Sequence, residues 1–270
     1  MKPDFGNTAS DYARHRAGFP ESFFARVAAS GIGRPGQRIV DLGTGTGTLA
    51  RGFARRGCDV IGIDPAEAML AQARALDEAG PRERGLGGST RYLAARAEDT
   101  GLPSACADIV SAGQCWHWFD RPRAAREVAR LLAPEGRVLI AHFDWLPLGE
   151  GASANLVRAT EELIERFNPS WTMGNGLGVH PQWLRDLGEA GFRDIETFSY
   201  DESVPYTPEA WRGRIRASAG VAASLPADRV TEFDAALAQL LASRYPGDVL
   251  DIPHRVFAVI ARRPPSDALG

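Results

Sequence analysis

Short apolar runs alternate with helical patterns between residues 37 and 141 of this 270-residue chain. Each run is about five residues long, which is the usual length of a strand. Strands that alternate with helices along a chain are typical of an α/β fold with a parallel sheet. The alternation therefore predicts a parallel sheet wound with helices, with strands at residues 38–42, 59–63, 91–95, 108–112 and 137–141.

A glycine-rich turn follows the first predicted strand. Residues 39–48 read IVDLGTGTGT and lead into a predicted helix at 49–56. Gly43, Gly45 and Gly47 permit positive φ angles and leave no Cβ that would keep a ligand away from the backbone. Open α/β sheets bind their ligands at the carboxyl ends of strands, where this turn lies. The turn therefore predicts a ligand-binding loop.

An acidic residue ends the second predicted strand. Asp64 follows Gly43 by 21 residues, and its carboxylate can accept both hydroxyls of an adenosine ribose. Hydrogen bonds to a charged group contribute about 1.5–3 kcal/mol each. Asp64 also suits a helix N-cap, with Pro65 at the first helical position, and the two roles can coexist.

Two classes of nucleotide fit this arrangement, dinucleotides and S-adenosylmethionine. A pyrophosphate favours the pattern G-x-G-x-x-G, with bare amides at the start of the helix. The sixth position counted from Gly43 is Thr48, and the carboxylate of Asp41 would repel a diphosphate. The same carboxylate would attract the ammonium group of a methionine moiety. The loop therefore favours S-adenosylmethionine, and an NAD(P)-dependent oxidoreductase is the alternative.

Five motifs occur in order within residues 37–141: VDLGTGTG, IGID, RAEDTGLP, DIVSAGQCWHWFD and RLLAPEGRVLI. Together they resemble the successive motifs of class I S-adenosylmethionine-dependent methyltransferases. The HWFD segment, with Tyr12, Arg16 and Pro20 ahead of the sheet, resembles the small-molecule branch that includes trans-aconitate and ubiquinone-type enzymes. The resemblance implies an α/β, Rossmann-like sheet of seven strands with the last strand antiparallel, a helical amino-terminal cover and methyl transfer to a small-molecule acceptor.

The resemblance also implies which residues contact the cofactor. The glycine turn, including Thr44, would supply backbone contacts, Asp41 would face the ammonium group, and Asp64 would bind the ribose diol. Tyr12 and Arg16 are four residues apart, so on a helix they share one face and could close over the cofactor; a solvated polar face is the alternative. The remaining candidates are Pro65 and Met69 for adenine packing, Ala97 and Glu98 for the adenine edge, and Gln114 beside the methionine moiety.

Methyl transfer is an in-line displacement, so the protein must chiefly align the acceptor with the methyl group. A general base is needed only when the acceptor is protonated, as an alcohol is. His117 follows the fourth predicted strand, between Trp116 and Trp118, and is the candidate base; lining or packing are its other possible roles. Trp116, Trp118, His142 and Trp145 are the candidate acceptor-contacting residues. Oxygen is preferred over nitrogen or carbon as the acceptor atom, and no metal is expected.

The rest of the chain predicts one domain with an insertion after the fifth strand. Residues 149–167 look helical, and the loop at 168–181 is rich in Gly, Pro and Asn. Trp145, Trp171, Met173 and His180 could form an apolar lid there, or could pack in a core. The predicted segments are a helical cover at 1–36, a cofactor-binding core at 37–141, a lid at 142–190, carboxyl-terminal strands and helices at 191–262 and a tail at 263–270.

Charge and composition limit the partners. Subtracting 34 acidic from 31 basic residues gives a net charge of −3, which argues against a general nucleic-acid or anionic-membrane surface. The sequence shows neither a signal peptide nor an apolar span, and its three cysteines lack the C-x-x-C spacing of a zinc site. We therefore expect a cytoplasmic protein, either monomer or homodimer, with a small-molecule partner. A non-catalytic S-adenosylmethionine-binding protein is the second alternative.

Overall fold

The computed structural model describes residues 14–15, 17–79, 87–148 and 150–265. Tyr12 and Arg16 lie outside this part of the chain. The described residues divide into two compact units. Unit 1 takes them from Met1–Ala17, Asp144–Val179 and Tyr200–Arg255; unit 2 takes them from Gly18–Phe143, His180–Ser199 and Val256–Gly270.

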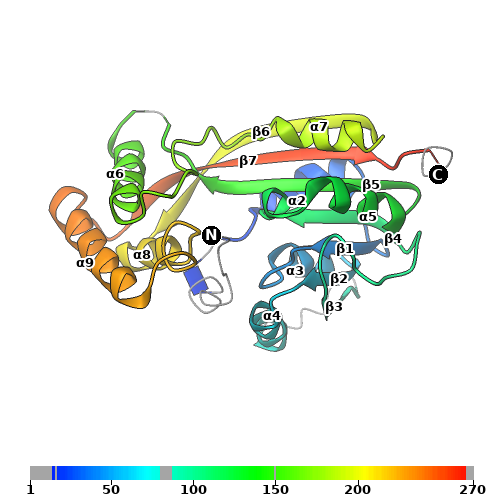
Figure 1. Cartoon of the computed structure of the whole chain (residues 1–270), viewed down its shortest axis with the longest axis horizontal. Coiled ribbons are helices and arrows are strands. Elements are labelled where there is room, and N and C mark those ends of the chain that lie inside the picture. Colours follow the sequence, from blue (N-terminus) through cyan, green and yellow to red (C-terminus); the bar gives the residue numbers. More distant parts are fainter. Residues whose placement is uncertain (1–13, 16, 80–86, 149, 266–270) are drawn as a thin grey trace. The chain divides into compact units, whose positions relative to one another are not determined.

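The main sheet has seven strands in the order β3-β2-β1-β4-β5-β7-β6. Strands β1 to β5 pair in parallel, whereas β7 runs antiparallel, as the arrows in Figure 1 show. This confirms the expected sheet with an antiparallel last strand. The strands are β1 (Arg38–Leu42), β2 (Asp59–Asp64), β3 (Ser89–Ala94), β4 (Ala107–Gly113), β5 (Leu132–Trp145), β6 (Arg193–Tyr206) and β7 (Leu250–Arg262).

The order of the strands reverses between β1 and β4. The chain passes from β1 outward to β2 and β3, and then returns to lay β4 against the other side of β1. Val40 of β1 pairs with Ile61 of β2 and with Val110 of β4, so β1 is central. Ligands of open α/β sheets bind at such a reversal, beyond the carboxyl ends of the strands. The topology therefore directs attention to the segments that follow β1 and β4.

Strand β1 has the predicted ends, and β2, β3 and β4 shift by no more than two residues. Strand β5 is much longer than predicted, because Leu132 already pairs with Ala107 of β4. The next pair is Ile109 with Arg137, so the residues between are an irregularity inside the strand, where Glu135 has a φ of +64°. The expected helix start at Pro65 was wrong, since α4 begins at Glu67.

Five helices of unit 2 accompany this sheet. They carry apolar faces inward, as with Phe23, Phe24 and Val27 of α2 and Met69, Leu70 and Ala73 of α4. The side chain of Asp120 accepts a hydrogen bond from the backbone N–H of Arg123 and so caps α5. The helices are α2 (Glu21–Ala29), α3 (Thr48–Ala54), α4 (Glu67–Ala79), α5 (Arg121–Leu131) and α7 (Gln182–Glu189).

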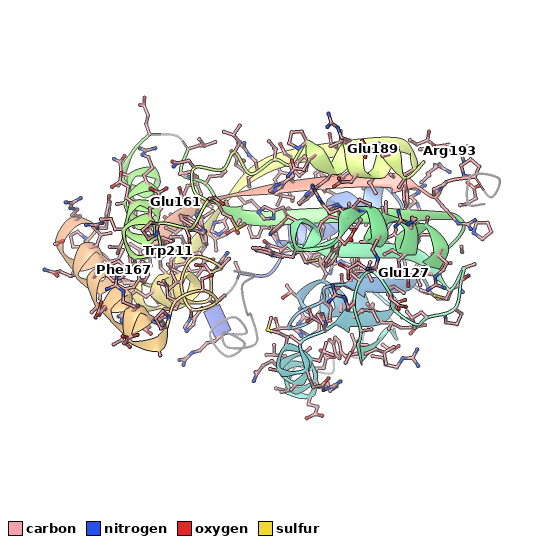
Figure 2. All side chains as sticks on the ribbon, viewed as in Figure 1. Glu127, Glu161, Phe167, Glu189, Arg193 and Trp211 are labelled. Carbon is pink, nitrogen blue, oxygen red and sulfur yellow. The ribbon has the colours of Figure 1, made fainter. Side chains whose placement is uncertain are left out.

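Unit 1 has its own apolar core. Helices α6 (Ala152–Phe167), α8 (Pro208–Arg216) and α9 (Ala227–Arg244) contribute Ile164, Trp211 and Phe233, all fully buried. Trp211 is labelled in Figure 2. Residues 168–181 form neither helix nor strand, as predicted. The segment 142–190, expected as a lid, is divided between the units: 144–179 belongs to unit 1 and 180–190 to unit 2.

Replacing each of two helical glycines of unit 2 by alanine is expected to change stability in opposite directions. A Cβ at Gly52 in α3 would overlap the ring of Phe24, whereas a Cβ at Gly188 in α7 would meet nothing within 4 Å. We expect Gly52→Ala to lower the free energy of unfolding by about 1–3 kcal/mol through overpacking. Gly188→Ala should raise it by about 0.5–1 kcal/mol, because alanine loses less conformational entropy in a helix. Urea unfolding of both variants checks the signs, and equal effects would contradict the packing argument.

Candidate functional site

The glycine loop, Gly43 to Gly47, joins β1 to α3. Its three glycines all have positive φ angles, +61° at Gly43, +55° at Gly45 and +77° at Gly47. A Cβ at Gly43 would stand 2.7 Å from the sulfur of Cys115, which follows β4. Both the backbone conformation and the close approach therefore require glycine at position 43. The loop after β1 and the segment after β4 are thus in direct contact.

Asp41 holds the base of the glycine loop. Its side chain is 1% exposed, and its two oxygens accept hydrogen bonds of 2.6 Å from the hydroxyls of Thr44 and Ser111. Burial raises the pKa of Asp41 to about 6, against the lowering effect of these two hydrogen bonds; the charge of Asp64 raises it further. These hydrogen bonds connect Asp41 to Thr44 of the glycine loop and to Ser111 of β4. A titratable carboxylate therefore lies next to the loop.

This raised pKa predicts an unusual pH dependence of stability. The usual pKa of an aspartate is near 4, so between about pH 4 and pH 6 folded protein binds more protons at Asp41 than unfolded protein does. The contribution of Asp41 to stability therefore falls as the pH rises through this window, by at most about 3 kcal/mol. Asp41→Asn should gain stability relative to wild type over the same window. Urea unfolding of both proteins at pH 4, 5, 6 and 7 measures it, and a constant difference would contradict the prediction.

Asp64, the last residue of β2, lies against the same loop. One carboxylate oxygen accepts the backbone N–H of Gly45 and the other accepts that of Ala66, both at 2.9 Å. Burial raises the pKa of Asp64, while these two backbone hydrogen bonds lower it. Each carboxylate oxygen has a second lone pair, so the group can still accept two hydroxyls from a ligand. Asp64 thus caps the turn before α4 and remains competent to bind a diol.

The segment after β3 contains the predicted adenine-edge residues. Ala97 is buried, and an oxygen of Glu98 accepts the backbone N–H of Asp120 at 2.8 Å. Glu127 of α5 accepts hydrogen bonds from the backbone N–H and the hydroxyl of Thr100, at 3.0 and 2.5 Å. Burial opposes ionisation of Glu127, but hydrogen bonds from Arg130 and Thr100 lower its pKa overall. Helix α5, which carries Glu127 (Figure 2), therefore fixes this segment at both ends.

Two predicted adenine-packing residues differ in exposure. Met69 in α4 is buried, and its terminal methyl lies 3.3 Å from where a Cβ of Gly45 would stand. Pro65, which precedes α4, is exposed. Met69 is therefore an apolar contact of the glycine loop itself, and Pro65 is free to meet an adenine ring from the solvent side.

The backbone after β4 turns sharply. Gln114 has a φ of +67°, a conformation that is uncommon outside glycine and is often found at functional sites. Its side-chain amide donates a 2.5 Å hydrogen bond to the carbonyl of Phe143, and its backbone N–H bonds the carbonyl of Ala141 at 2.8 Å. The thiol of Cys115 donates to the carbonyl of Leu42 at 3.1 Å. These bonds hold the end of β4 beside the ends of β1 and β5.

The short helix η2 (Trp116–Trp118) follows this turn. Trp116 is fully buried, and its indole N–H donates a 3.0 Å hydrogen bond to Asp186 of α7. His117 and Trp118 are half-buried, with ring centroids 4.6 Å apart. Trp116, expected to contact the acceptor, therefore lies in the packing between η2 and α7 and holds its two neighbours in position.

Three imidazoles from distant segments meet next to η2. We call His117, His142 of β5 and His180, which precedes α7, the imidazole cluster. The ring centroid of His142 lies 6.0 Å from that of His117 and 4.5 Å from that of His180. His180 also stacks on Trp183 at 4.2 Å and 11°. No group of three histidine, cysteine or acidic side chains in the described ranges is suited to a metal ion.

Other predicted residues belong to unit 1. Trp145 donates its indole N–H to Glu161 at 2.9 Å and lies under the guanidinium of Arg214 at 4.5 Å. Arg214 in turn donates to Asp144 at 2.7 Å. Glu161, labelled in Figure 2, also accepts the backbone N–H of Asn175, so it connects the loop at 168–181 to α6. Trp145 is thus part of a hydrogen-bonded network inside unit 1.

Four residues contribute to the site but were not predicted from the sequence. Ser111 bonds Asp41 from a position 70 residues away, and Glu127 fixes the segment after β3. Asp186 and Trp183 hold Trp116 and His180 from α7. A polar residue inside a buried strand, such as Ser111, is the one signal that could have been noticed.

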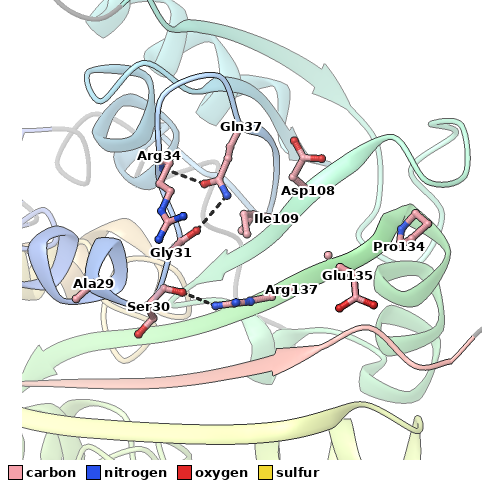
Figure 3. A pocket seen from close by; sticks show the side chains of 11 residues that line it. Ala29, Ser30, Gly31, Arg34, Gln37, Asp108, Ile109, Pro134, Glu135 and Arg137 are labelled. Carbon is pink, nitrogen blue, oxygen red and sulfur yellow. Dashed lines mark hydrogen bonds between the residues drawn. The ribbon is translucent and has the colours of Figure 1, made fainter.

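A cavity of about 450 Å³ lies at the opposite edge of the sheet in unit 2 (Figure 3). Its walls come from the segment before β1, the start of β4 and the first part of β5, so it adjoins the amino ends of these parallel strands. The side chain of Gln37 bridges this segment, accepting the N–H of Arg34 at 2.9 Å and donating to the carbonyl of Gly31 at 3.0 Å. None of the predicted site residues lines this cavity.

Comparison with known proteins gives a consistent family. A family described as a methyltransferase domain matches residues 40–140. An uncharacterized methyltransferase of Mycobacterium tuberculosis is 36% identical over 202 residues, covering 69% of this chain and 76% of the relative. The ubiquinone/menaquinone biosynthesis C-methyltransferase UbiE of Vibrio campbellii is 37% identical over 180 residues, covering 62% of this chain and 68% of that protein.

A solved structure shares the fold. Phosphoethanolamine N-methyltransferase 2 of Haemonchus contortus, in complex with phosphomonomethylethanolamine and S-adenosylhomocysteine, superposes with a TM-score of 0.56. It is 21% identical, and the match covers 98% of this chain and 60% of that protein. At this identity the likeness concerns the fold alone.

Among the described residues, no helix has the length and apolar character needed to cross a membrane.

Proposed function

The chain belongs to the S-adenosylmethionine-dependent methyltransferases, and on that premise we propose that it methylates a hydroxyl oxygen of a small-molecule acceptor. The observation that carries the proposal is the contact between the glycine loop and the segment after β4. Cys115 contacts this loop, and His117 follows two residues later in η2. In this proposal His117 is the acceptor-side base and the glycine loop binds the cofactor, both at the carboxyl edge of the sheet.

The residues around the loop fit the cofactor. Positive φ angles at Gly43, Gly45 and Gly47 leave the loop backbone bare, and Asp64 keeps two lone pairs for the ribose hydroxyls. Ala97 with Glu98 would meet the adenine edge, while Pro65 and Met69 would pack on its ring. Gln114 would lie beside the methionine moiety, and the charge of Asp41 beneath the loop would favour its ammonium group. Tyr12 and Arg16 remain proposed contacts.

Alignment of the acceptor is the main task of the protein in this reaction. When bound, the cofactor supplies an electrophilic methyl group on a sulfonium. His117 would accept the proton of the acceptor hydroxyl, and Trp118 and His142 would line the space beside it. Trp116, through its bond to Asp186, would hold η2 still while the acceptor is aligned. Positioning of this kind can supply several kcal/mol of the barrier reduction.

Methylation at carbon is the second candidate, because the relative from Vibrio campbellii carries the name C-methyltransferase. The ortho carbon of a phenol, or the β carbon of an enol, becomes nucleophilic when the hydroxyl loses its proton, so the same base serves both reactions. In a phenol the methylated ring carbon then loses its own proton to solvent, which restores the aromatic ring. The acceptor atom is therefore decided by which atom faces the methyl group. Trp145 remains a proposed acceptor contact.

The test is a turnover assay with S-adenosylmethionine and a panel of hydroxylated, amino and carboxylic small molecules. We expect formation of S-adenosylhomocysteine with at least one hydroxylated acceptor, and NMR of the product distinguishes O-methyl from C-methyl. Calorimetry with S-adenosylhomocysteine and with NAD should show binding of the first only. Binding without turnover on a broad panel would favour a non-catalytic protein, and binding of NAD alone would refute the proposal.

A further inference from the structure

We propose that the cavity at the amino ends of β1, β4 and β5 is a second ligand site, which binds the phosphate group of a small organic phosphate monoester. Its volume of about 450 Å³ is within the usual range for sites that bind small molecules (Figure 3). None of the predicted site residues lines it. The inference therefore goes beyond the proposed function, and it is tested without a methyl acceptor.

Two guanidinium groups from distant segments meet at one wall of this cavity (Figure 3). Arg137 of β5 donates a hydrogen bond to the carbonyl of Ser30. The guanidinium of Arg34 lies over the next residue, with Nη2 3.3 Å from where a Cβ of Gly31 would stand. Gly31 has a φ of +81° and no side chain, which leaves room for this guanidinium. Both positive charges therefore lie against the same two residues of the wall.

These two charges are not neutralised by ion pairs. Among the residues that the structure describes, no carboxylate forms an ion pair with Arg34 or with Arg137. The bond to Ser30 uses one nitrogen of Arg137, so most N–H groups of that side chain are left for a ligand. The wall therefore carries donors and positive charge that the protein itself does not use.

The two acidic residues in the lining are paired with other cations. Asp108 accepts hydrogen bonds from the guanidinium of Arg38 at 2.6 and 3.3 Å, and these bonds lower the pKa of Asp108 against the opposing effect of burial. Glu135 accepts a hydrogen bond from Arg262 at 3.0 Å, and its side chain is 81% exposed, so solvent and salt screen its charge. Neither Arg38 nor Arg262 lines the cavity. The uncommitted charge in the wall is therefore positive.

The end of helix α2 does not account for the two arginines. The helix ends at this wall, and the carbonyls at a helix end carry about half a negative charge. The carbonyl of Ser30 already accepts from Arg137, and the carbonyl of Gly31 accepts from the side-chain amide of Gln37 at 3.0 Å. Two full positive charges exceed this partial charge, so the wall keeps a net positive charge.

The turn that carries Arg34 is held by the protein itself. The side-chain oxygen of Gln37 accepts the backbone N–H groups of Gly33 and Arg34 at 2.8 and 2.9 Å. The backbone N–H of Gly36 donates to the carbonyl of Gly57 at 2.8 Å. The backbone beneath Arg34 is thus fixed before a ligand binds, which reduces the entropy cost of binding.

A phosphate monoester matches this wall in charge and in shape. It carries a charge of about −1.5 to −2 at pH 7 and three strong acceptor oxygens. Two arginine forks present donors in the geometry that phosphate oxygens accept. Ile109 and Pro134 add apolar surface to the lining, against which the organic part can pack. A monocarboxylate has a smaller charge and fewer oxygens, so we expect it to bind more weakly.

The experiment measures binding of phenyl phosphate to the full chain by ligand-observed NMR, in about 150 mM salt to screen loose surface attraction. We expect a dissociation constant of about 1 mM or lower, as a ligand of this size allows. Benzoate should bind at least about fivefold more weakly. Arg34→Gln and Arg137→Gln should each weaken phenyl phosphate binding about tenfold or more, because each removes a charged donor. Arg126→Gln, at an exposed position of α5 outside the lining, should change the constant less than about twofold.

The same titration on protein saturated with S-adenosylhomocysteine separates the cavity from the glycine loop, whose bare backbone could also attract a phosphate. Phenyl phosphate should bind equally well to the saturated protein, and displacement by the nucleoside would overturn the proposal. Absence of binding to wild type, or full affinity in both arginine variants, would also overturn it. Urea unfolding shows whether the variants are folded; Arg34 is exposed, so Arg34→Gln decides if Arg137→Gln does not fold. If the nucleoside itself does not bind, the proposed function fails while the two arginine variants still test the cavity.

Discussion

Asp64→Asn should weaken binding of S-adenosylhomocysteine roughly 100-fold. The substitution replaces a charged acceptor by a neutral amide, and the two proposed bonds to the ribose hydroxyls would each lose about 1.5 kcal/mol. A total of about 3 kcal/mol corresponds to a factor of about 100 in the dissociation constant. Isothermal titration calorimetry measures the change. Asp59→Asn, at the other end of β2, is the matched control and should change the constant less than twofold.

A second comparison separates diol recognition from damage to the loop, because Asp64 also accepts the backbone N–H of Gly45. The 2′-deoxy analogue of S-adenosylhomocysteine lacks one of the hydroxyls. Wild type should prefer the natural nucleoside by about tenfold or more, and Asp64→Asn should show little preference, as a double-mutant cycle requires of interacting groups. If the variant keeps the full preference, Asp64 does not bind the ribose, and its role is confined to the turn before α4.

The parts of the site that were predictable are those encoded within one strand and the turn after it. The apolar run RIVDL gave the limits of β1, and the glycines that follow it could be assigned to a tight turn because few residues adopt positive φ. Asp64 could be placed at the end of β2 because it directly follows the apolar run of that strand. The alternation of strands and helices then gave the parallel core, since such strands need crossover connections.

The parts that were not predictable depend on contacts between distant segments. The bond from Ser111 to Asp41 joins β4 to β1; a serine inside a buried strand can be noticed in the sequence, but no local pattern identifies Asp41 as its partner. The residues of the imidazole cluster are separated by up to 63 positions, and only the fold brings His180 against His142. The length of β5 was missed because a proline and a glycine in sequence indicate a turn, whereas the sheet accommodates them as an irregularity.

Asp41 and Asp64 are two similar carboxylates whose different hydrogen-bond partners suit them to different roles. Both lie at the carboxyl ends of neighbouring strands, and burial raises the pKa of each. Asp41 is satisfied by two hydroxyls of the protein, whereas Asp64 receives only backbone N–H groups. The first is therefore suited to fixing the loop, and the second to accepting a ligand.

His117→Gln should reduce kcat by about 100-fold or more with a hydroxyl acceptor, because removal of a general base costs 10²- to 10⁴-fold. Glutamine is of similar size and remains polar, so η2 should keep its bond from Trp116 to Asp186, and the affinity for S-adenosylhomocysteine should stay within twofold. Stopped assays of S-adenosylhomocysteine formation measure kcat, and calorimetry measures the affinity.

The decisive comparison uses an analogue of the acceptor whose hydroxyl is already ionised at the assay pH. Such an analogue needs no base, so His117→Gln should then reduce kcat by less than about fivefold. A residue that only lines or orients the acceptor would impair both substrates alike, since alignment is needed whether or not a proton is removed. An equal loss with the two acceptors would therefore assign His117 to the wall of the site and leave proton removal to solvent or to His142.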